Sequence, residues 1–517
     1  MAEPITLLGV MPPSSGDSAG PPGSAGSEAA TGPGRRLLLA TIYVGIALAL
    51  VGALFTRPIV GVGLGAAAVI GPIALLRPRV ALLLLVAVTV TNTSTVVGER
   101  GGIGLYLMAL ILALASLVLG VARGELRPAW SPVFLLAALF VGTRALSLLW
   151  ASDPGAGLPV VVSAAKDSVF LVVVTMLLSG TSGGVRVTRL VVACIALLAA
   201  VTLVNEFVLH NATELAGFSR VPLTDELGAA TSRHSGPEED PNFWGRSLVL
   251  FLPLALSLAA ADSTRRRRMW ALAAAAMVGA VYLTQSRGGF IACAAAALAW
   301  LALAGARYRK LLVAVPVAGV VILLAVPGIS SRLLTLRDLG SSGGQSGDPS
   351  LAGRVASQRT ALDMFLDHPG TGVGAGNFEV LQPEYRRREG LAAKPVAPHN
   401  TYLELASEGG VLGLLGWLAF YGGAAFVALR ALVVVRRLEP SPGRSQMAVC
   451  LVGVLAALVG WGVASAFLPL GGFRNLLTVF ALAAAADIEM CRQVRGGRDG
   501  PPEQPARHLP AQVAAAG

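Results

Sequence analysis

One stretch of the chain, Pro398-His399-Asn400-Thr401-Tyr402, places a histidine and an amide just before a long apolar run. Histidine takes up a proton near neutral pH, which suits activation of a hydroxyl nucleophile. If the segment is helical, Glu404 lies roughly 140° from His399 on the 3.6-residue period, so a dyad within one helix is not expected. Asn400 and Glu404 instead share a face. A histidine at a helix start that hydrogen-bonds water is the alternative, and spacing alone favours it.

Two arginines stand at the edges of apolar runs among small or polar neighbours. Arg246 closes Pro241-Asn242-Phe243-Trp244-Gly245-Arg246, and Arg287 lies in Gln285-Ser286-Arg287-Gly288-Gly289. A guanidinium fork matches phosphate oxygens and stays charged, and the glycines allow close approach of a ligand. The pattern predicts an anionic ligand such as a lipid diphosphate. Ordinary snorkelling at a membrane interface is the alternative.

Other motifs predict no metal and no cofactor. Gly370-Thr-Gly372-Val-Gly374-Ala-Gly376 resembles a dinucleotide loop, but no βαβ pattern surrounds it, so a tight turn is expected. The run Glu238-Glu239-Asp240 lacks a metal-ligand spacing and is interpreted as a solvated loop. The four cysteines are scattered singly.

The elements that carry these residues follow from composition. Of 517 residues, 54% are hydrophobic and 13% charged, with a mean hydropathy of +0.69. Soluble domains carry about 25% charged residues, so a soluble enzyme and a disordered protein are both excluded. The net charge of +11 would fit nucleic acid only on a soluble basic module, so no nucleic-acid partner is predicted.

Apolar runs of about 20 residues predict an all-α polytopic membrane protein with about 14 transmembrane helices. The expected spans are 37–55, 59–76, 80–97, 103–122, 132–150, 157–178, 187–208, 243–261, 269–286, 288–305, 310–328, 411–435, 446–468 and 473–489.

Alternate loops differ in basic residues by 22 to 4, which predicts that both termini lie in the cytoplasm. The expected organisation is a disordered cytoplasmic tail at 1–34, transmembrane helices 1–11 within 35–328, an extracytoplasmic loop or cap at 329–410, helices 12–14 within 411–489, and a second disordered tail at 490–517.

Charged residues at membrane depth are costly and usually mark a site. With the predicted orientation, Arg144, Lys166, Asp167, Arg246 and Arg287 fall in the outer half of the membrane, below the 329–410 segment. We therefore expect an outward-facing cavity with excess positive charge.

These local patterns together resemble the O-antigen ligase and O-antigen polymerase superfamily of bacterial envelopes. The resemblance covers roughly 240–430 and rests on three signatures. They are Asp240-Pro241-Asn242 with Arg246, the Gln285–Gly289 run, and a loop pattern from Gly353-Arg354 through Asp367-His368-Pro369 and the Gly372–Phe378 turn to His399-Asn400-Thr401-Tyr402.

The resemblance implies metal-independent transfer of a glycan from an undecaprenyl-diphosphate donor to an acceptor hydroxyl on the outer face of the bacterial cytoplasmic membrane. It places the histidine role on His399 and the donor-binding roles on Arg287 and Arg354, with Arg246 and Asn400 as further binding candidates. The expected partners are the polyprenyl-linked donor, a glycan or lipid-glycan acceptor and membrane lipids. A polysaccharide polymerase of the same superfamily, and a transporter or flippase of lipid-linked glycan, are the alternatives.

Overall fold

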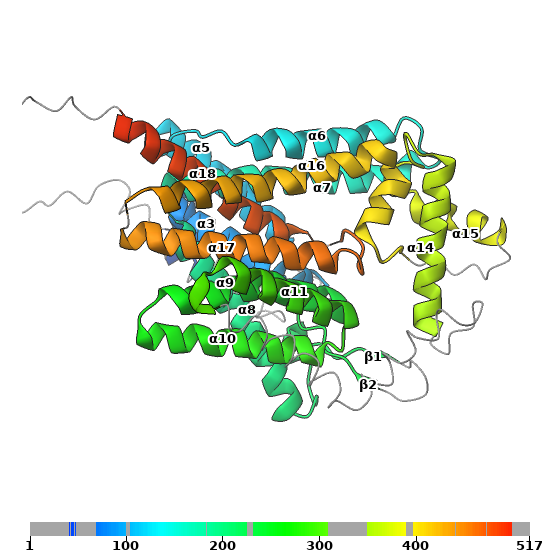
Figure 1. The fold of residues 1–517 in the computed structure, drawn as a ribbon, viewed down its shortest axis with the longest axis horizontal. Coiled ribbons are helices and arrows are strands. Elements are labelled where there is room, and N and C mark those ends of the chain that lie inside the picture. The colour runs from blue at the N-terminus through cyan, green and yellow to red at the C-terminus, as the bar shows by residue number, and fades with distance from the viewer. Residues whose placement is uncertain are drawn as a thin grey trace, which may run out of the picture. The chain divides into compact units, whose positions relative to one another are not determined.

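The computed structural model describes residues 69–99, 104–181, 183–224, 231–308, 349–388, 397–439, 441–471 and 473–498, with a few positions between 41 and 47. The chain divides into two units, Met1–Pro72 and Ile73–Gly517, and nearly all of the described residues lie in the second. In this unit long helices run side by side as a bundle, and one helix, α14, lies across an end of it (Figure 1).

The described part of this unit is helical apart from one small hairpin. Its main helices are α3 (Pro78–Val90), α4 (Thr93–Gly98), α5 (Leu105–Ala122), α6 (Pro132–Ser147), α7 (Pro154–Thr181), α8 (Gly184–Phe207), α9 (Pro241–Ala261), α10 (Thr264–Leu283), α11 (Arg287–Leu303), α14 (Pro349–Asp367), α15 (Phe378–Arg388), α16 (Thr401–Arg437), α17 (Pro442–Ala464) and α18 (Arg474–Arg498). Short 3-10 turns occupy Leu215–Gly217 and Ala306–Tyr308. The strands β1 (Leu223–Thr224) and β2 (Thr231–Ser232) pair antiparallel.

Six of the described helices are long and apolar enough to cross a membrane: α5, α7, α8, α9, α16 and α17. Three shorter apolar helices, α3, α6 and α11, accompany them. The predicted all-α class is therefore confirmed for the described residues. The spans expected at 37–55, 59–76 and 310–328 fall wholly or mostly outside those residues, as do both predicted tails, so the count of 14 stays a prediction.

The span expected at 80–97 is two helices. Asn92 adopts a left-handed conformation, with φ of 51°, and separates α3 from α4. Asparagine enters this region more readily than most residues. The Asn92 amide then donates to the carbonyl of Pro237 and to a Glu238 carboxylate oxygen, both at 3.1 Å. A bond to a segment 145 positions away thus fixes a break that hydropathy does not reveal.

The span expected at 411–435 follows a helical segment within α16. A kink at Gly410, where φ is 60° and ψ is −158°, separates the two parts of this helix. The part after the kink corresponds to the expected span.

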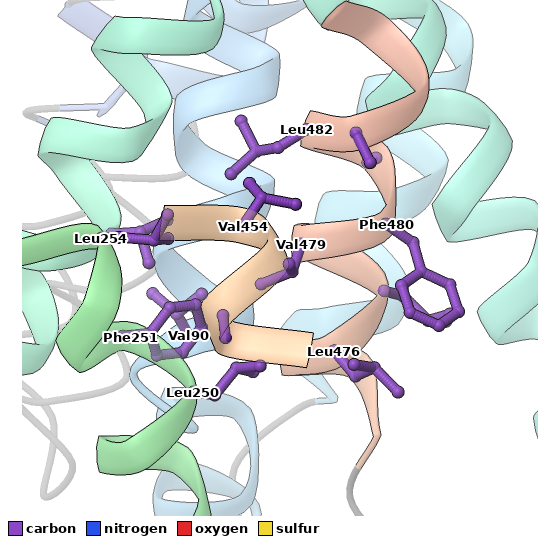
Figure 2. Packing of buried hydrophobic residues seen from close by; sticks show 14 of the residues in the cluster. Val90, Leu250, Phe251, Leu254, Val454, Leu476, Val479, Phe480 and Leu482 are labelled. Carbon is purple, nitrogen blue, oxygen red and sulfur yellow. The ribbon is translucent and has the colours of Figure 1, made fainter. Parts of the chain in front are cut away.

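The core of the bundle is apolar and closely packed. Val90 of α3, Phe251 of α9, Val454 of α17 and Val479 of α18 point toward one another within it, as Figure 2 shows. Gly460 of α17 lets the neighbouring helices approach, because a Cβ there would lie 2.7 Å from the Cβ of Ala296 on α11. Burial of this surface holds the helices in register, so that their ends meet in a defined arrangement.

A small helical layer covers one end of the bundle. α14 crosses that end, and α15 lies against it on the side away from the bundle (Figure 1). Ala361, Met364, Val373, Phe378 and Tyr385 form a separate core for this layer, and Leu403 of α16 packs against it. The layer, defined here as residues 349–388, is thus a folded cap built onto α16.

Candidate functional site

The candidate histidine lies immediately before α16, outside the helix. The Asn400 side chain caps α16 by accepting hydrogen bonds from the N–H groups of Tyr402 and Leu403, at 3.0 and 3.2 Å. His399 therefore has left-handed backbone geometry, with φ of 49°, and the helical-face comparison with Glu404 does not apply to it. Its Nδ1 is buried and makes no hydrogen bond to the described residues. The hydrogen-bonding capacity of that ring nitrogen is therefore unsatisfied within the described residues.

The loop between α17 and α18, residues 465–471, fixes the position of this histidine. Thr401 donates from its N–H to the Ser465 carbonyl and from its hydroxyl to the Leu468 carbonyl, both at 2.8 Å. Glu404 accepts a hydrogen bond from the Leu470 N–H at 2.7 Å. The start of α16 is thereby joined to the start of α18, and His399 sits on a rigid support.

The same loop occupies Arg246. This side chain is almost fully buried on α9, and its guanidinium donates to the carbonyls of Pro469, at 2.8 Å, and Gly471. It also lies over the rings of Phe243 and Trp461, with centroid distances of 4.9 and 4.2 Å. Because the Arg246 guanidinium is hydrogen-bonded to the 465–471 loop, it stabilises that loop, and these donors are not open to a diphosphate.

Arg287 begins α11 at the same end of the bundle and is partly buried. Ser286 caps this helix by accepting a hydrogen bond from the Gly289 N–H at 3.1 Å. The next residue, Gly288, lies under Phe467 of the 465–471 loop, where an added Cβ would come within 2.8 Å of the Phe467 Cβ. Arg287 is thus set beside the loop that also carries the start of α16.

Arg354 approaches His399 from the cap. It lies on α14, is partly buried, and its positive charge acts on His399. Burial, and then the Arg354 charge, lower the pKa of His399 below its usual value, while Asp240 acts in the opposite direction. The imidazole is therefore neutral at pH 7, the form that can accept a proton.

The Gly370–Gly376 segment, expected from the sequence to be a tight turn, connects the cap to the bundle. Val373 and Gly374 donate to the carbonyls of Ser407 and Glu408, both at 2.8 Å. Gly372 has φ of 68°, and a Cβ there would come within 2.4 Å of the Glu408 backbone. Only glycine fits this position without moving the chain.

Below this turn lies a buried ion pair. Arg144 of α6 donates to a carboxylate oxygen of Glu408 at 2.9 Å, and both side chains are less than a tenth exposed. Removing either partner would leave a buried charge uncompensated, which costs about 3–5 kcal/mol in buried pairs. The pair therefore fixes α6 to the kink of α16.

A cavity of about 650 Å³ opens at the same end of the bundle. Its charged lining contains five carboxylates and two arginines, so the predicted excess of positive charge was wrong for this cavity. These charged residues are Asp167, Glu238, Glu239, Asp240, Glu404, Arg144 and Arg474.

The Lys166-Asp167 pair, expected at membrane depth, separates in the structure. Lys166 is exposed, whereas Asp167 is buried. Asp167 accepts hydrogen bonds from Arg474 at 2.8 Å and from the Tyr106 hydroxyl at 3.2 Å. The Arg474 guanidinium also lies 3.9 Å from the centre of the Tyr106 ring. One buried cluster thus joins α5, α7 and α18 at the cavity wall.

The interpretation of Glu238-Glu239-Asp240 as a solvated loop also needs correction. Asp240 caps α9 by accepting a hydrogen bond from the Asn242 N–H at 2.7 Å. Glu238 accepts from Asn92, and burial raises the pKa of its carboxyl to about 7. Glu239 is exposed, whereas Glu238 and Asp240 are partly buried. Within the described part of the chain, no group of three or more histidine, cysteine, aspartate or glutamate side chains is arranged to hold a metal ion.

The sequence singles out His399 and the arginines as candidates, but it does not reveal that the 465–471 loop contacts the start of α16 and Arg246. The one hint was Pro469 followed by Gly471-Gly472 between two apolar runs, a pattern typical of a structured turn. Glu408 and Asp167 gave a second hint, because carboxylates inside apolar helices need a partner.

Comparison with known proteins agrees with this picture. Residues 272–418 match the family model of the O-antigen ligase domain, which spans α10 to the first half of α16 and includes Arg287, Arg354, His399 and Asn400, but not Arg246. No curated protein matches the chain. The chain is a multi-pass membrane protein, and its residues 272–418 match the O-antigen ligase family.

Proposed function

We propose that this protein transfers a glycan from a polyprenyl-diphosphate donor, undecaprenyl diphosphate in bacteria, to an acceptor hydroxyl. The observation that carries the proposal is the position of His399 inside the matched domain, with a buried Nδ1 that makes no hydrogen bond to the described residues. The reaction takes place at the outer face of the cytoplasmic membrane. The cap and His399 lie on that outer side, and both termini lie in the cytoplasm.

In this proposal His399 is the general base. Burial and the nearby Arg354 charge favour its neutral form, so it can take the proton from the acceptor hydroxyl as that oxygen attacks the anomeric carbon. The rigid support from Thr401 and the 465–471 loop keeps the imidazole in place during attack. Asn400 is engaged in capping through its side-chain oxygen and leaves its amide N–H groups for the substrate.

The arginines act on the leaving group. Breaking the anomeric C–O bond places negative charge on the departing polyprenyl diphosphate. Arg287 and Arg354 stabilise that charge from the bundle and from the cap, respectively. Direct displacement by the acceptor oxygen inverts the anomeric carbon. Neither arginine needs to move a proton, and no step requires a cofactor or a metal.

The proposal is tested in a strain that lacks this protein. Such a strain should accumulate polyprenyl-diphosphate-linked glycan, and the wild-type gene should relieve the accumulation, whereas His399→Ala should not. His368→Ala, at an exposed position of the same cap, is the matched control and should restore transfer. Full relief by His399→Ala at equal protein level would remove the catalytic assignment.

Ligase and polymerase differ in the acceptor. A ligase joins the glycan to a different glycan or lipid-glycan, and a polymerase joins it to a second lipid-linked glycan. Purified protein given donor alone separates the two, because only a polymerase lengthens the lipid-linked glycan without another acceptor.

A further inference from the structure

The 650 Å³ cavity has no part in the mechanism above, although it lies at the same end of the bundle. Ligand pockets occupy about 300–1,000 Å³, so this space is large enough for a small molecule or the end of a chain. The ends of α3, α5, α6, α7, α9, α16 and α18 meet around it. Figure 1 shows α14 crossing this end of the bundle.

Its charges are unequally paired. Arg474 is bound to Asp167, and Arg144 is bound to Glu408, a residue outside the lining. The lining therefore keeps four carboxylates, Glu238, Glu239, Asp240 and Glu404, that have no arginine or lysine within ion-pair distance among the described residues. Those that are ionised would repel a diphosphate. Glu238 is ionised only in part at pH 7, because burial raises its pKa to about 7, and the charge of Arg246 acts on Glu238, Asp240 and Glu404.

The remaining lining is typical of sites that recognise sugars. Phe243 and Phe473, which are partly exposed, present aromatic surface on which the C–H face of a sugar ring can pack. Carboxylates, together with Asn92 and Ser163, accept hydrogen bonds from hydroxyl groups. No described group of these carboxylates is arranged for a metal ion. The chemistry favours a hydroxyl-rich ligand that is neutral or carries an amino group.

The cavity adjoins the candidate base. Asp240, which lines it, is close enough for its charge to act on His399, and Glu404 follows His399 by five residues in the first turns of α16. Arg287 and Arg354 are absent from the residues that line the cavity. Charges from both regions therefore act on His399: that of Asp240 from the cavity wall and that of Arg354 from the cap.

We propose that this cavity binds the saccharide of the acceptor, recognising an uncharged or amino-bearing sugar through its hydroxyl groups and excluding the diphosphate. The inference rests on the proposed function for the identity of the ligand as an acceptor. The carboxylates of the cavity then favour the acceptor, and Arg287 and Arg354 favour the diphosphate of the donor. The acceptor hydroxyl and the leaving group thus reach His399 from different directions.

A matched pair of substitutions on α7 tests the cavity. Ser163 lines it, whereas its neighbour Val162 is 46% exposed on the outside of the helix. Purified full-length protein in detergent is applied to an array of neutral, amino-bearing and uronic-acid-bearing oligosaccharides. Wild type and Val162→Trp should bind neutral or amino-bearing glycans in preference to uronic acids. The affinity of Ser163→Trp for those glycans should be at least tenfold lower.

A second measurement on the same samples uses undecaprenyl diphosphate as the probe. Its affinity should be equal in wild type, Val162→Trp and Ser163→Trp, and equal values also show that the filled-cavity variant is folded. Glycan binding by Ser163→Trp at the wild-type level, a preference for uronic acids, or no glycan binding by wild type would each overturn the cavity assignment.

The two proposals fail in different ways. Wild-type protein that binds glycans but has no affinity for undecaprenyl diphosphate contradicts the donor in the proposed function and leaves a saccharide cavity. Protein that binds undecaprenyl diphosphate, with glycan binding unaffected by Ser163→Trp, contradicts the cavity alone.

Discussion

The cavity and the cap, which both lie near His399, differ in the partners of their arginines. At the cavity, Arg144 and Arg474 are paired with carboxylates, and Arg246 is bound to backbone carbonyls beside it. On the cap side, Arg354 makes no ion pair with any described residue, and its charge acts on the imidazole. Arginines close in space therefore have different uses, and only their partners reveal which hold the fold and which are left for a ligand.

The largest expected effect is at Arg287. If its fork binds the diphosphate, Arg287→Ala should lower the rate of transfer by about 10²–10³-fold, the usual cost of removing one charge-stabilising donor. Arg287→Lys should recover little, because an ammonium cannot make the two parallel bonds. Initial rates and undecaprenyl-diphosphate affinity of the purified variants measure this. Wild-type affinity in Arg287→Ala would move the diphosphate away from this side.

The turn that joins cap and bundle gives the next effect. Gly372→Ala should lower the free energy of unfolding by about 2–4 kcal/mol, because the methyl group meets the Glu408 backbone and the positive φ is strained. Gly370→Ala is the control, since nothing lies within 4 Å of its Cβ position. Thermal unfolding in detergent measures both. Equal stability of the two variants would mean that the cap is not fastened through this turn.

A smaller effect is expected at Arg354, as a shift in pH dependence. Its charge helps keep the pKa of His399 low, so transfer should persist below the usual range of histidine titration. In Arg354→Ala the pKa of His399 should rise, and the acidic limb of the rate profile should move to higher pH. Arg359→Ala, on an exposed face of α14, should leave the limb unchanged. An unshifted limb in Arg354→Ala would separate this arginine from the base.

The smallest effect concerns Glu238 in the cavity. Burial raises its pKa to about 7, from 4.5, so between these pH values the native state holds a proton that the unfolded state releases. Stability should therefore fall as pH rises from about 4.5 to 7. Glu238→Gln should weaken this fall, and Glu239→Gln, which leaves Glu238 in place, should retain it. The comparison uses melting temperatures at pH 5 and 8. The same difference between the two pH values in wild type, Glu238→Gln and Glu239→Gln would contradict a buried Glu238.

Much of the fold was predictable because each span is a long apolar run. α5, α7, α8, α9 and α17 lie close to their expected positions. The breaks were harder to predict, since they depend on distant partners. Asn92, for example, splits an apolar run by donating hydrogen bonds to Pro237 and Glu238.

The site was half predictable for the same reason. His399, Arg287 and Arg354 stand in recognisable local patterns, and they lie within the matched domain. Arg246 shows the limit, because its pattern suggests a ligand while its guanidinium binds the carbonyls of Pro469 and Gly471. The charge of the cavity was predicted with the wrong sign, since the Glu238-Glu239-Asp240 run looks like a solvated loop in sequence and lines the cavity in the fold.

The central claim, that this protein breaks a glycan–diphosphate bond rather than moving an intact lipid, is tested most directly in vesicles. Purified protein is reconstituted with fluorescent undecaprenyl-diphosphate-linked glycan and a mixture of acceptor glycans. We predict release of undecaprenyl diphosphate and a glycan joined to acceptor, with no product from His399→Ala despite normal donor binding. Movement of the glycan across the bilayer with its diphosphate linkage intact, equally in wild type and His399→Ala, would contradict the account.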